Sequence, residues 1–497
     1  MWGVIVSRFL PVLILVLLTT TSLIVFNVKP VSALPFTVYI RVDGSIDPPS
    51  ANITTSDNVT YVFTDHNFCG MQVERDNIVI DGAGYVLRGI YEGSIMDPSE
   101  NNTHVGLGLM GRNNVTVQNL NIIYVPIGIS LYGALNCTIR RNTINVDGPF
   151  MGATCIRMPE CANITVVDNT ILNSYRGIDL DDASKNQIAR NRFINDMSAI
   201  EMTTTSNNVV TENSFVWTPF SLIIDTASND SFYHNNFYHR HYGMGRLDAF
   251  WNEVDWNQSY AVGGNYWSDY VGVDLYSGPY QNETGSDGIG DTQQVFAEGA
   301  AEMYPLMGPW TAAGEQVTVI DPSGVSVTFS NVTAEGMTMI ETATSPDPMP
   351  GSKAVGCYDI RTEAEYSGNI SISLPYDNSS VTDDDERFLR LVQWNETSRT
   401  WIDITTSIGR RWDGEDWLNT ANGETSSLSL FAVMWRLAGD IKADAVVDIY
   451  DAILLANAFN SIPGSPNWNP DANMNGDFTV DIFDAIILAN NYGRTIL

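Results

Sequence analysis

The last sixty residues contain two acidic segments that repeat each other at an offset of 33 residues. Segment 440–451 is DIKADAVVDIYD and segment 473–484 is NMNGDFTVDIFD. Apart from Lys442, the side chains at positions 1, 3, 5, 9 and 12 carry oxygen, and position 7 offers a backbone carbonyl. A calcium ion takes six to eight oxygen ligands, and a helix–loop–helix site supplies them from these positions. Each segment continues into a short apolar stretch, so 438–497 is predicted to form two calcium loops, each followed by a helix.

This pair of segments resembles a type I dockerin module, with Asp instead of Glu at position 12. The resemblance implies that the metal ligands are Asp440, Asp444, Val446, Asp448, Asp451, Asn473, Asn475, Asp477, Thr479, Asp481 and Asp484, with Val446 and Thr479 acting through backbone oxygens. It also implies a cohesin-type protein partner. The alternative is a helix pair that holds its shape without metal.

Three features depart from the dockerin pattern. Lys442 replaces an oxygen donor in the first loop, and the turn glycine at position 6 is Ala445 in one loop and Phe478 in the other. Side chains at a turn position that favours glycine disfavour the sharp turn, so we expect weaker calcium binding, particularly in the first loop. Positions 10 and 11 are apolar, as Ile449-Tyr450 and Ile482-Phe483. These pairs either contact a partner or pack internally against the preceding domain.

A second group of charged residues lies in a region of repeated strands. Ile178 and Leu180 are expected to point inward, which turns Asp179 and Asp181 outward. One period of 22 residues then places Glu201 beside Asp179. The outward set is Arg157, Asp179, Asp181, Glu201 and Asp225.

Carboxylates on adjacent strands would lie about 5 Å apart, and those two strands apart roughly 10 Å. These separations overlap those used in glycoside hydrolysis. The same set could hold calcium while an arginine acts as a base, as in pectate lyases. A solvated acidic face is the simpler interpretation, because polygalacturonase motifs such as Gly-His-Gly are absent.

The strands that would position these residues come from an internal repeat between Gly106 and Phe237. An asparagine, or Lys185 in one copy, recurs in steps of 22 residues with one step of 27, at Asn114, Asn136, Asn163, Lys185, Asn207 and Asn229. Apolar residues alternate within each copy, and no stretch between copies could form a crossover helix. A repeat of this length predicts stacked coils, here a right-handed parallel β-helix.

Two further columns follow from the stacking. A second asparagine recurs at Asn142, Asn169, Asn191, Asn213 and Asn235, where side-chain amides can form a ladder between coils. The preceding residues alternate in charge, as Arg141, Asp168, Arg190, Glu212 and His234. Opposite charges suit adjacent strands, so we interpret this column as structural.

The segments after the coils carry a more specific resemblance. They read GNYWSDY at 264–270, DGIGD at 287–291 and YPLM at 304–307. With these motifs, residues 55–310 resemble NosD-type β-helix proteins, a group with carbohydrate-binding and sugar-hydrolase members. The NosD resemblance also suggests a copper-site accessory role, for which His234, His239, His241 and Met244 are the available donors.

The fold is therefore expected to be mainly β, in four parts. These are a signal peptide at 1–33, a right-handed parallel β-helix at 34–310, an antiparallel β-sandwich at 311–437 and a dockerin-like module at 438–497. Alternating runs such as VSVTF at 325–329 and ISISL at 370–374 indicate the sandwich.

Composition constrains the partners and the compartment. The chain has 497 residues and a net charge of −33, which argues against a nucleic-acid partner. Arg8, an apolar run and the small residues at 31–33 indicate a secretion signal, with a membrane anchor as the alternative if it stays uncleaved. Many Asn-X-Ser/Thr triplets suit an exported, glycosylated chain. Among five cysteines, Cys155 and Cys161 could close a short disulfide loop.

The leading hypothesis is an extracellular or cell-surface, calcium-binding protein that binds a polysaccharide or surface glycan and docks through its tail. One alternative is a polysaccharide lyase or glycoside hydrolase that uses Asp179, Asp181, Glu201, Asp225 and Arg157 for polysaccharide breakdown. Others are a structural spacer of the cell envelope and the copper accessory role. Enzymatic activity is left open and is the less favoured interpretation.

Overall fold

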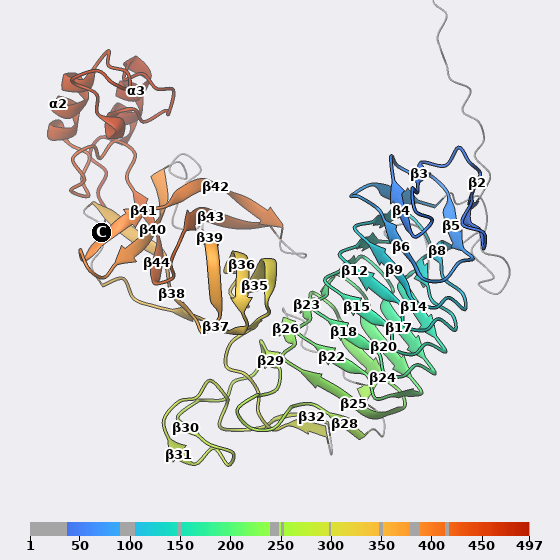
Figure 1. The fold of residues 1–497 in the computed structure, drawn as a ribbon. Helices are drawn as coiled ribbons and strands as arrows, with labels where there is room; N and C mark the ends of the chain where they lie inside the picture. The colour runs from blue at the N-terminus through green and yellow to red at the C-terminus, as the bar shows by residue number, and fades with distance from the viewer. Residues whose placement is uncertain are drawn as a thin grey trace, which may run out of the picture.

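The computed structural model describes residues 37–89, 105–146, 152–238, 248–249, 253–297, 300–346, 351–377, 388–412 and 417–496. The expected signal segment lies outside these residues. Figure 1 shows a parallel β-helix, then an antiparallel sandwich, then two short helices at the C-terminal end. Within the described part of the chain, no helix is long and apolar enough to cross a membrane.

Three long sheets form the wall of the β-helix. The ten-stranded sheet contains, in order, β2 (Ile46–Asp47), β1 (Thr37–Ile40), β5 (Gly70–Val73), β8 (Val105–Gly108), β11 (Ile127–Ser130), β14 (Thr154–Pro159), β17 (Arg176–Asp181), β20 (Ser198–Thr203), β24 (Phe220–Ile224) and β27 (Asp248–Ala249). The eleven-stranded sheet contains β21 (Thr205–Ser206), β25 (Ala227–Tyr233), β22 (Val209–Thr211), β18 (Gln187–Ala189), β15 (Thr165–Val167), β12 (Thr138–Arg140), β9 (Val115–Gln118), β6 (Ile78–Asp81), β4 (Thr60–Phe63) and β3 (Ile53–Thr54), with β28 (Glu253–Asp255) beside β25. The eight-stranded sheet contains β29 (Tyr266–Trp267), β26 (Asn236–Tyr238), β23 (Ser214–Val216), β19 (Arg192–Ile194), β16 (Thr170–Leu172), β13 (Thr143–Asn145), β10 (Asn121–Ile123) and β7 (Val86–Arg88).

Equivalent residues of successive coils pair directly, as the period predicts. Ile139 pairs with Val117 on one side and with Val166 on the other, and all three side chains are fully buried. Phe193, Phe215 and Phe237 stack inside with ring centroids 5.0 and 4.7 Å apart. The parallel β-helix is therefore confirmed, whereas its right-handed sense stays a prediction.

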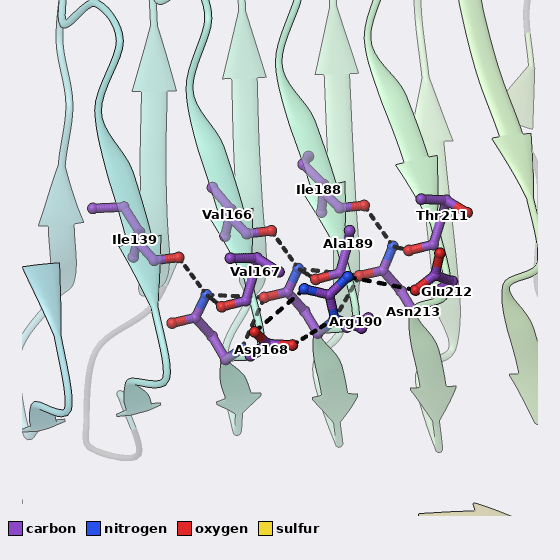
Figure 2. Close-up of polar contacts among 12 residues, drawn as sticks. Ile139, Val166, Val167, Asp168, Ile188, Ala189, Arg190, Thr211, Glu212 and Asn213 are labelled. Carbon is purple, nitrogen blue, oxygen red and sulfur yellow. Dashed lines mark hydrogen bonds and ion pairs between the residues drawn. The ribbon is translucent and has the colours of Figure 1, made fainter. Parts of the chain in front are cut away.

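A ladder of buried asparagine amides runs along the interior of the coils. In each rung, the side-chain oxygen of one asparagine accepts from the backbone and side chain of the previous one, as in Asn169 to Asn191 and Asn191 to Asn213. The same side chains donate to strand carbonyls such as that of Val166 (Figure 2). The ladder passes through Asn235 to Asn265 and ends on the buried carboxyl group of Glu302. Burial raises the pKa of Glu302 to about 8.

The alternating charge column lies beside this ladder on the outer surface. Arg190 Nε is 2.7 Å from Asp168 Oδ1, and Arg190 Nη1 is 3.6 Å from Glu212 Oε2 (Figure 2). Asp168, Arg190 and Glu212, the three central residues of the column, therefore form ion pairs between coils, which agrees with its structural interpretation.

The expected Cys155–Cys161 disulfide is wrong, because both cysteines are free and buried. Cys155 lies near the start of β14 and Cys161 follows the end of that strand. Residues 155–159 are extended strand and cover roughly 13 Å, whereas a disulfide needs Cα atoms within about 7 Å.

Two antiparallel sheets follow and enclose a separate core that includes Phe329, Ile372, Leu391 and Phe431. The six-stranded sheet contains β34 (Trp310–Thr311), β37 (Gly336–Thr342), β38 (Ser352–Thr362), β44 (Leu430–Arg436), β40 (Leu389–Asn395) and β41 (Thr400–Asp403). The five-stranded sheet contains β35 (Gly314–Ile320), β36 (Ser326–Ala334), β39 (Glu365–Pro375), β43 (Trp417–Thr425) and β42 (Thr405–Trp412). Between the β-helix and the sandwich lie two short hairpins, β30 (Tyr276–Ser277) with β31 (Glu283–Thr284) and β32 (Gln294–Ala297) with β33 (Ala300–Glu302).

The tail contains α2 (Ile449–Ala458), the short helix η4 (Pro470–Ala472) and α3 (Ile482–Asn491). The side chains of Asp448 and Asp481 cap the two α-helices in the same way. In each cap, the carboxylate three residues later, Asp451 or Asp484, accepts the backbone N–H of the cap residue. The internal repeat of the sequence is therefore a repeat in structure.

Candidate functional site

The acidic face of the β-helix forms around β17 and its neighbours. Arg157 pairs with Asp179, and Asp179 pairs with Glu201, so these three residues lie on adjacent strands. Asp181 pairs with Thr203 and is exposed, and Asp225 follows β24 one coil beyond Thr203 and is also exposed. The predicted neighbourhood is confirmed, but the five residues form one tight group of three and two outlying carboxylates.

Arginines hold the two central carboxylates. Arg157 Nε lies 4.0 Å from Asp179 Oδ2, and Arg176 forms a close ion pair with Glu201. Asp179 is 23% exposed and Glu201 is 17% exposed. Burial raises the pKa of Asp179, Arg176 opposes the rise, and Glu201 adds to it. The arrangement is a charge-balanced cluster that could position an anionic or polyhydroxyl ligand.

Sequence reasoning missed Arg176. Strict alternation along β17 would place it on the same side as Ile178, in the interior. Arg176 is the first residue of the strand, where the chain leaves a corner, and its side chain reaches Glu201 on the outer face.

The first loop of the tail gathers three carboxylates. Oxygens of Asp440, Asp444 and Asp451 lie within 4.8 Å of one another, the only such acidic or histidine–cysteine group found in the described residues. Asp440 and Asp451 are buried. Their oxygens also accept backbone N–H groups of the loop, from Asp444 and Ala445 to Asp440 and from Lys442 and Asp448 to Asp451. These carboxylates could hold a cation, although backbone groups occupy some of their lone pairs.

Lys442 enters this cluster from position 3. Its ammonium lies 2.8 Å from Asp444 Oδ2. The hydrogen bond between them lowers the pKa of Asp444 and raises the pKa of Lys442. The lysine therefore supplies a positive charge where a cation would need an oxygen ligand.

The second loop has the same backbone path and fewer acids. The backbone φ is 68° at Ala445 and 65° at Phe478, so both turns adopt the left-handed conformation despite their side chains. Asn473 Oδ1 is buried and has no hydrogen-bond partner in the part of the chain that is described. Asp440 and Asn473, the first residues of the two loops, line a common cavity of about 170 Å³. The other predicted ligands of this loop stay a prediction.

The apolar pairs at positions 10 and 11 do not pack internally. Ile449, Tyr450, Ile482 and Phe483 are between 55% and 60% exposed. The internal alternative is therefore wrong, because these residues begin α2 and α3 on the side of each helix that faces solvent.

Residues 69–272 match the family model described as periplasmic copper-binding protein (NosD). The matched NosD-like region covers less than half of the chain. It contains the acidic face and the GNYWSDY motif, whereas the DGIGD and YPLM motifs lie beyond it.

Similarities to solved structures are weak. DFA-IIIase from Arthrobacter chlorophenolicus A6 is 15% identical over 34% of this chain and 40% of that enzyme, with a TM-score of 0.27. The Dettilon tailspike protein is 10% identical over 80% of this chain and 94% of the tailspike, also with a TM-score of 0.27. The enzymatically active domain of bacteriophage CBA120 tailspike protein 2 is 11% identical over 75% and 71%, again at 0.27.

This chain spans only about 40% to 52% of the first three DFA-IIIase structures that it matches. Because these TM-scores are low, the description of the fold rests on the strand pairing and not on these similarities. No curated protein matches the chain.

Among the described residues, the predicted copper donors do not form a metal-binding group. His234 is buried, stacks on Trp310 at a ring-centroid distance of 3.5 Å, and has Nε2 2.7 Å from the Val262 carbonyl oxygen. Burial lowers its pKa. His239, His241 and Met244 lie outside the described residues.

Proposed function

We propose that the chain is an exported β-helix protein that binds calcium in its tail, attaches to a protein partner there, and binds glycan with its β-helical part. The observation that carries the proposal is the convergence of the Asp440, Asp444 and Asp451 carboxylates within 4.8 Å. Three carboxylates at this spacing repel one another, and a divalent cation removes that repulsion.

The second loop supports the same metal chemistry. Its buried Asn473 oxygen lacks a partner among the residues that the structure describes, and a buried polar atom without a partner is costly unless a ligand occupies it. Calcium accepts amide oxygens as readily as carboxylates. The likeness of the two loops, including the left-handed turns at Ala445 and Phe478, favours a dockerin-like pair of sites.

The docking surface would be the two exposed apolar pairs. Ile449 and Tyr450 hold the same place in the first unit as Ile482 and Phe483 hold in the second. A cohesin-type partner would have to offer an apolar surface, because small polar residues of the usual dockerin pattern are missing here.

Calcium titration of the full chain tests the proposal. We expect calcium to raise the melting temperature of the wild type, because a ligand stabilises the state that it binds. Asp440→Ala should reduce that rise, whereas Glu283→Gln, an exposed acid in β31, should leave it intact. An equal rise in both variants, or none in the wild type at millimolar calcium, contradicts the metal site.

Glycan binding by the β-helix is the second part of the proposal. The acidic face offers ordered carboxylates and arginines on a rigid sheet, and the tail is a separate attachment point. A glycan-array screen with and without calcium tests binding and its dependence on the tail. Removal of calcium should weaken attachment of the tail to its protein partner, whereas the β-helical part should still bind glycan.

A polysaccharide lyase or glycoside hydrolase is the alternative that Asp179 and Glu201 favour. They lie on adjacent strands, one carries a raised pKa, and arginines adjoin both. Release of reducing ends or unsaturated sugars from acidic polysaccharides would show catalysis. If the double variant Asp179→Ala with Glu201→Ala released sugars at the wild-type rate, this face would not be the catalytic one. A copper accessory role has less support, because the one described histidine of that set, His234, is buried in the structure.

A further inference from the structure

A groove lies between the β-helix and the sandwich, with one mainly polar part and one mainly apolar part. Its two parts have volumes of about 590 and 450 Å³, and both are lined by Arg192 and Thr318. Each volume falls in the range of small-ligand sites, which span about 300–1,000 Å³. We refer to the two parts together as the junction groove.

One wall of the junction groove is the outer face of the eight-stranded sheet. Strand pairing places Thr170, Arg192, Ser214 and Asn236 in register, one residue per coil. Adjacent strands are about 4.8 Å apart, so this column offers polar groups at regular intervals. A regular column suits a ligand that is itself a chain of repeated units.

The other wall is the start of the sandwich, and hydrogen bonds fix it to the β-helix. Asn236 Nδ2 donates to the carbonyl of Trp310 at 2.8 Å, and the backbone N–H of Ile320 donates to the Tyr238 hydroxyl at 3.3 Å. Trp217 and Tyr238 add aromatic surface to the groove. The walls are therefore held in place without a ligand.

Arg192 lacks the partners that its neighbour has. Arg190 is paired with Asp168 and Glu212, as Figure 2 shows. The guanidinium of Arg192 has no hydrogen bond or ion pair with any described residue, although it is half-buried between the two walls. Burial lowers the pKa of Arg192, and Tyr238 opposes that change. A partly desolvated guanidinium without an acceptor is costly, and an anionic ligand would remove that cost.

We propose that the junction groove binds a saccharide chain that carries carboxylates, with Arg192 binding one carboxylate. The planar guanidinium can hold a carboxylate through two parallel hydrogen bonds. The hydroxyl side chains of Thr170 and Ser214 in the same column suit sugar hydroxyls, and the aromatic rings suit the faces of sugar rings. The inference rests on the glycan binding proposed above and gives it a place and a substrate class, away from the acidic face.

Calorimetric titration of the full chain with trigalacturonate, its fully methyl-esterified form and maltotriose tests the inference. The wild type should bind trigalacturonate and bind the neutral ester at least about tenfold more weakly. Arg192→Gln should raise the Kd for trigalacturonate by a similar factor. Arg140→Gln is the matched control, because Arg140 lies on β12 in another sheet and bonds to Gln118.

A second variant guards against a folding defect. Ser214→Tyr adds bulk to the column without removing charge, and it should weaken trigalacturonate binding while the melting temperature stays near that of the wild type. Unchanged affinity in a folded Arg192→Gln protein, or equal affinity for the acid and its ester, would overturn the site. If glycan arrays show binding that neither groove variant alters, glycan recognition stands and only the junction groove fails. If no glycan binds at all, the glycan-binding part of the proposed function fails with it.

Discussion

Lys442 and Asp444 form an ion pair of 2.8 Å inside the carboxylate cluster of the first loop. Lys442 thus takes the position of one predicted calcium ligand, and its ammonium group pairs with the carboxylate of another, Asp444. Lys442→Asp should free Asp444 and add an oxygen donor, so calcium affinity should rise by about tenfold or more. Calcium titration by calorimetry measures the change. Lys353→Asp makes the same charge change on the exposed surface of β38 and should have little effect. Equal affinities in the two variants would show that Lys442 does not limit binding.

Phe478 holds a left-handed turn with φ of 65° in the second loop. This conformation costs a non-glycine residue about 1–2 kcal/mol. Phe478→Gly should lower that cost in the ordered loop and strengthen calcium binding several-fold. Phe478→Ala removes the same side chain but keeps the Cβ atom, so it should not reproduce the gain. A matching gain in the alanine variant would attribute the effect to the phenyl ring.

Asp196 should make stability depend on pH. Burial raises its pKa to about 7, above the usual value of 3.8, while hydrogen bonds from Ser174 oppose the rise. A carboxyl group whose folded pKa is raised favours folding while it is protonated, so its contribution falls as pH rises from about 4 to 7. Asp196→Asn should remove this part of the slope and raise the melting temperature at neutral pH.

The control for this prediction is Asp182→Asn, an exposed carboxylate in the same sheet region. It should leave the pH profile of the melting temperature unchanged. Burial raises the pKa of Glu302 to about 8, so the melting temperature should still decline up to that pH in every variant. A flat wild-type profile between pH 4 and 8 would be inconsistent with both buried acids.

Asn191 is a central rung of the buried amide ladder. Its side chain bonds to Asn169, Asn213 and two strand carbonyls. Asn191→Ala leaves several buried groups without partners, each costing about 1–3 kcal/mol, so we expect a loss of at least 3 kcal/mol in unfolding free energy. Chemical denaturation measures it. Gln187→Ala on the exposed face of β18 should change stability by about 0.5 kcal/mol or less.

Periodicity predicted the coils because one step of 22 residues fixes both pairing and side-chain direction. Asp179 therefore meets Glu201, and Ile139 lies between Val117 and Val166, as expected. The same logic could not find Arg176, because a corner reverses the direction that strand alternation assigns. It could not find the junction groove either, since the two walls come from segments on either side of a domain boundary.

The tail shows a different limit. The loop positions identified the carboxylates that converge, but the sequence could not say whether Ile449 and Tyr450 face the sandwich or solvent. Packing between domains decides that question, and a local pattern carries no information about it. Position 6 shows the opposite effect, because Ala445 and Phe478 adopt the turn that their side chains disfavour.

Because equivalent residues of successive coils pair directly, one coil is the unit by which the length of this β-helix can change. Excision of residues 186–207 would bring Lys185 to Asn208 and restore the pattern on both sides, since Lys185 and Asn207 hold equivalent positions. The body would shorten by one inter-strand step of about 4.8 Å. The number of coils therefore sets the length of a β-helix of this kind, and with it the distance between groups bound at its two ends.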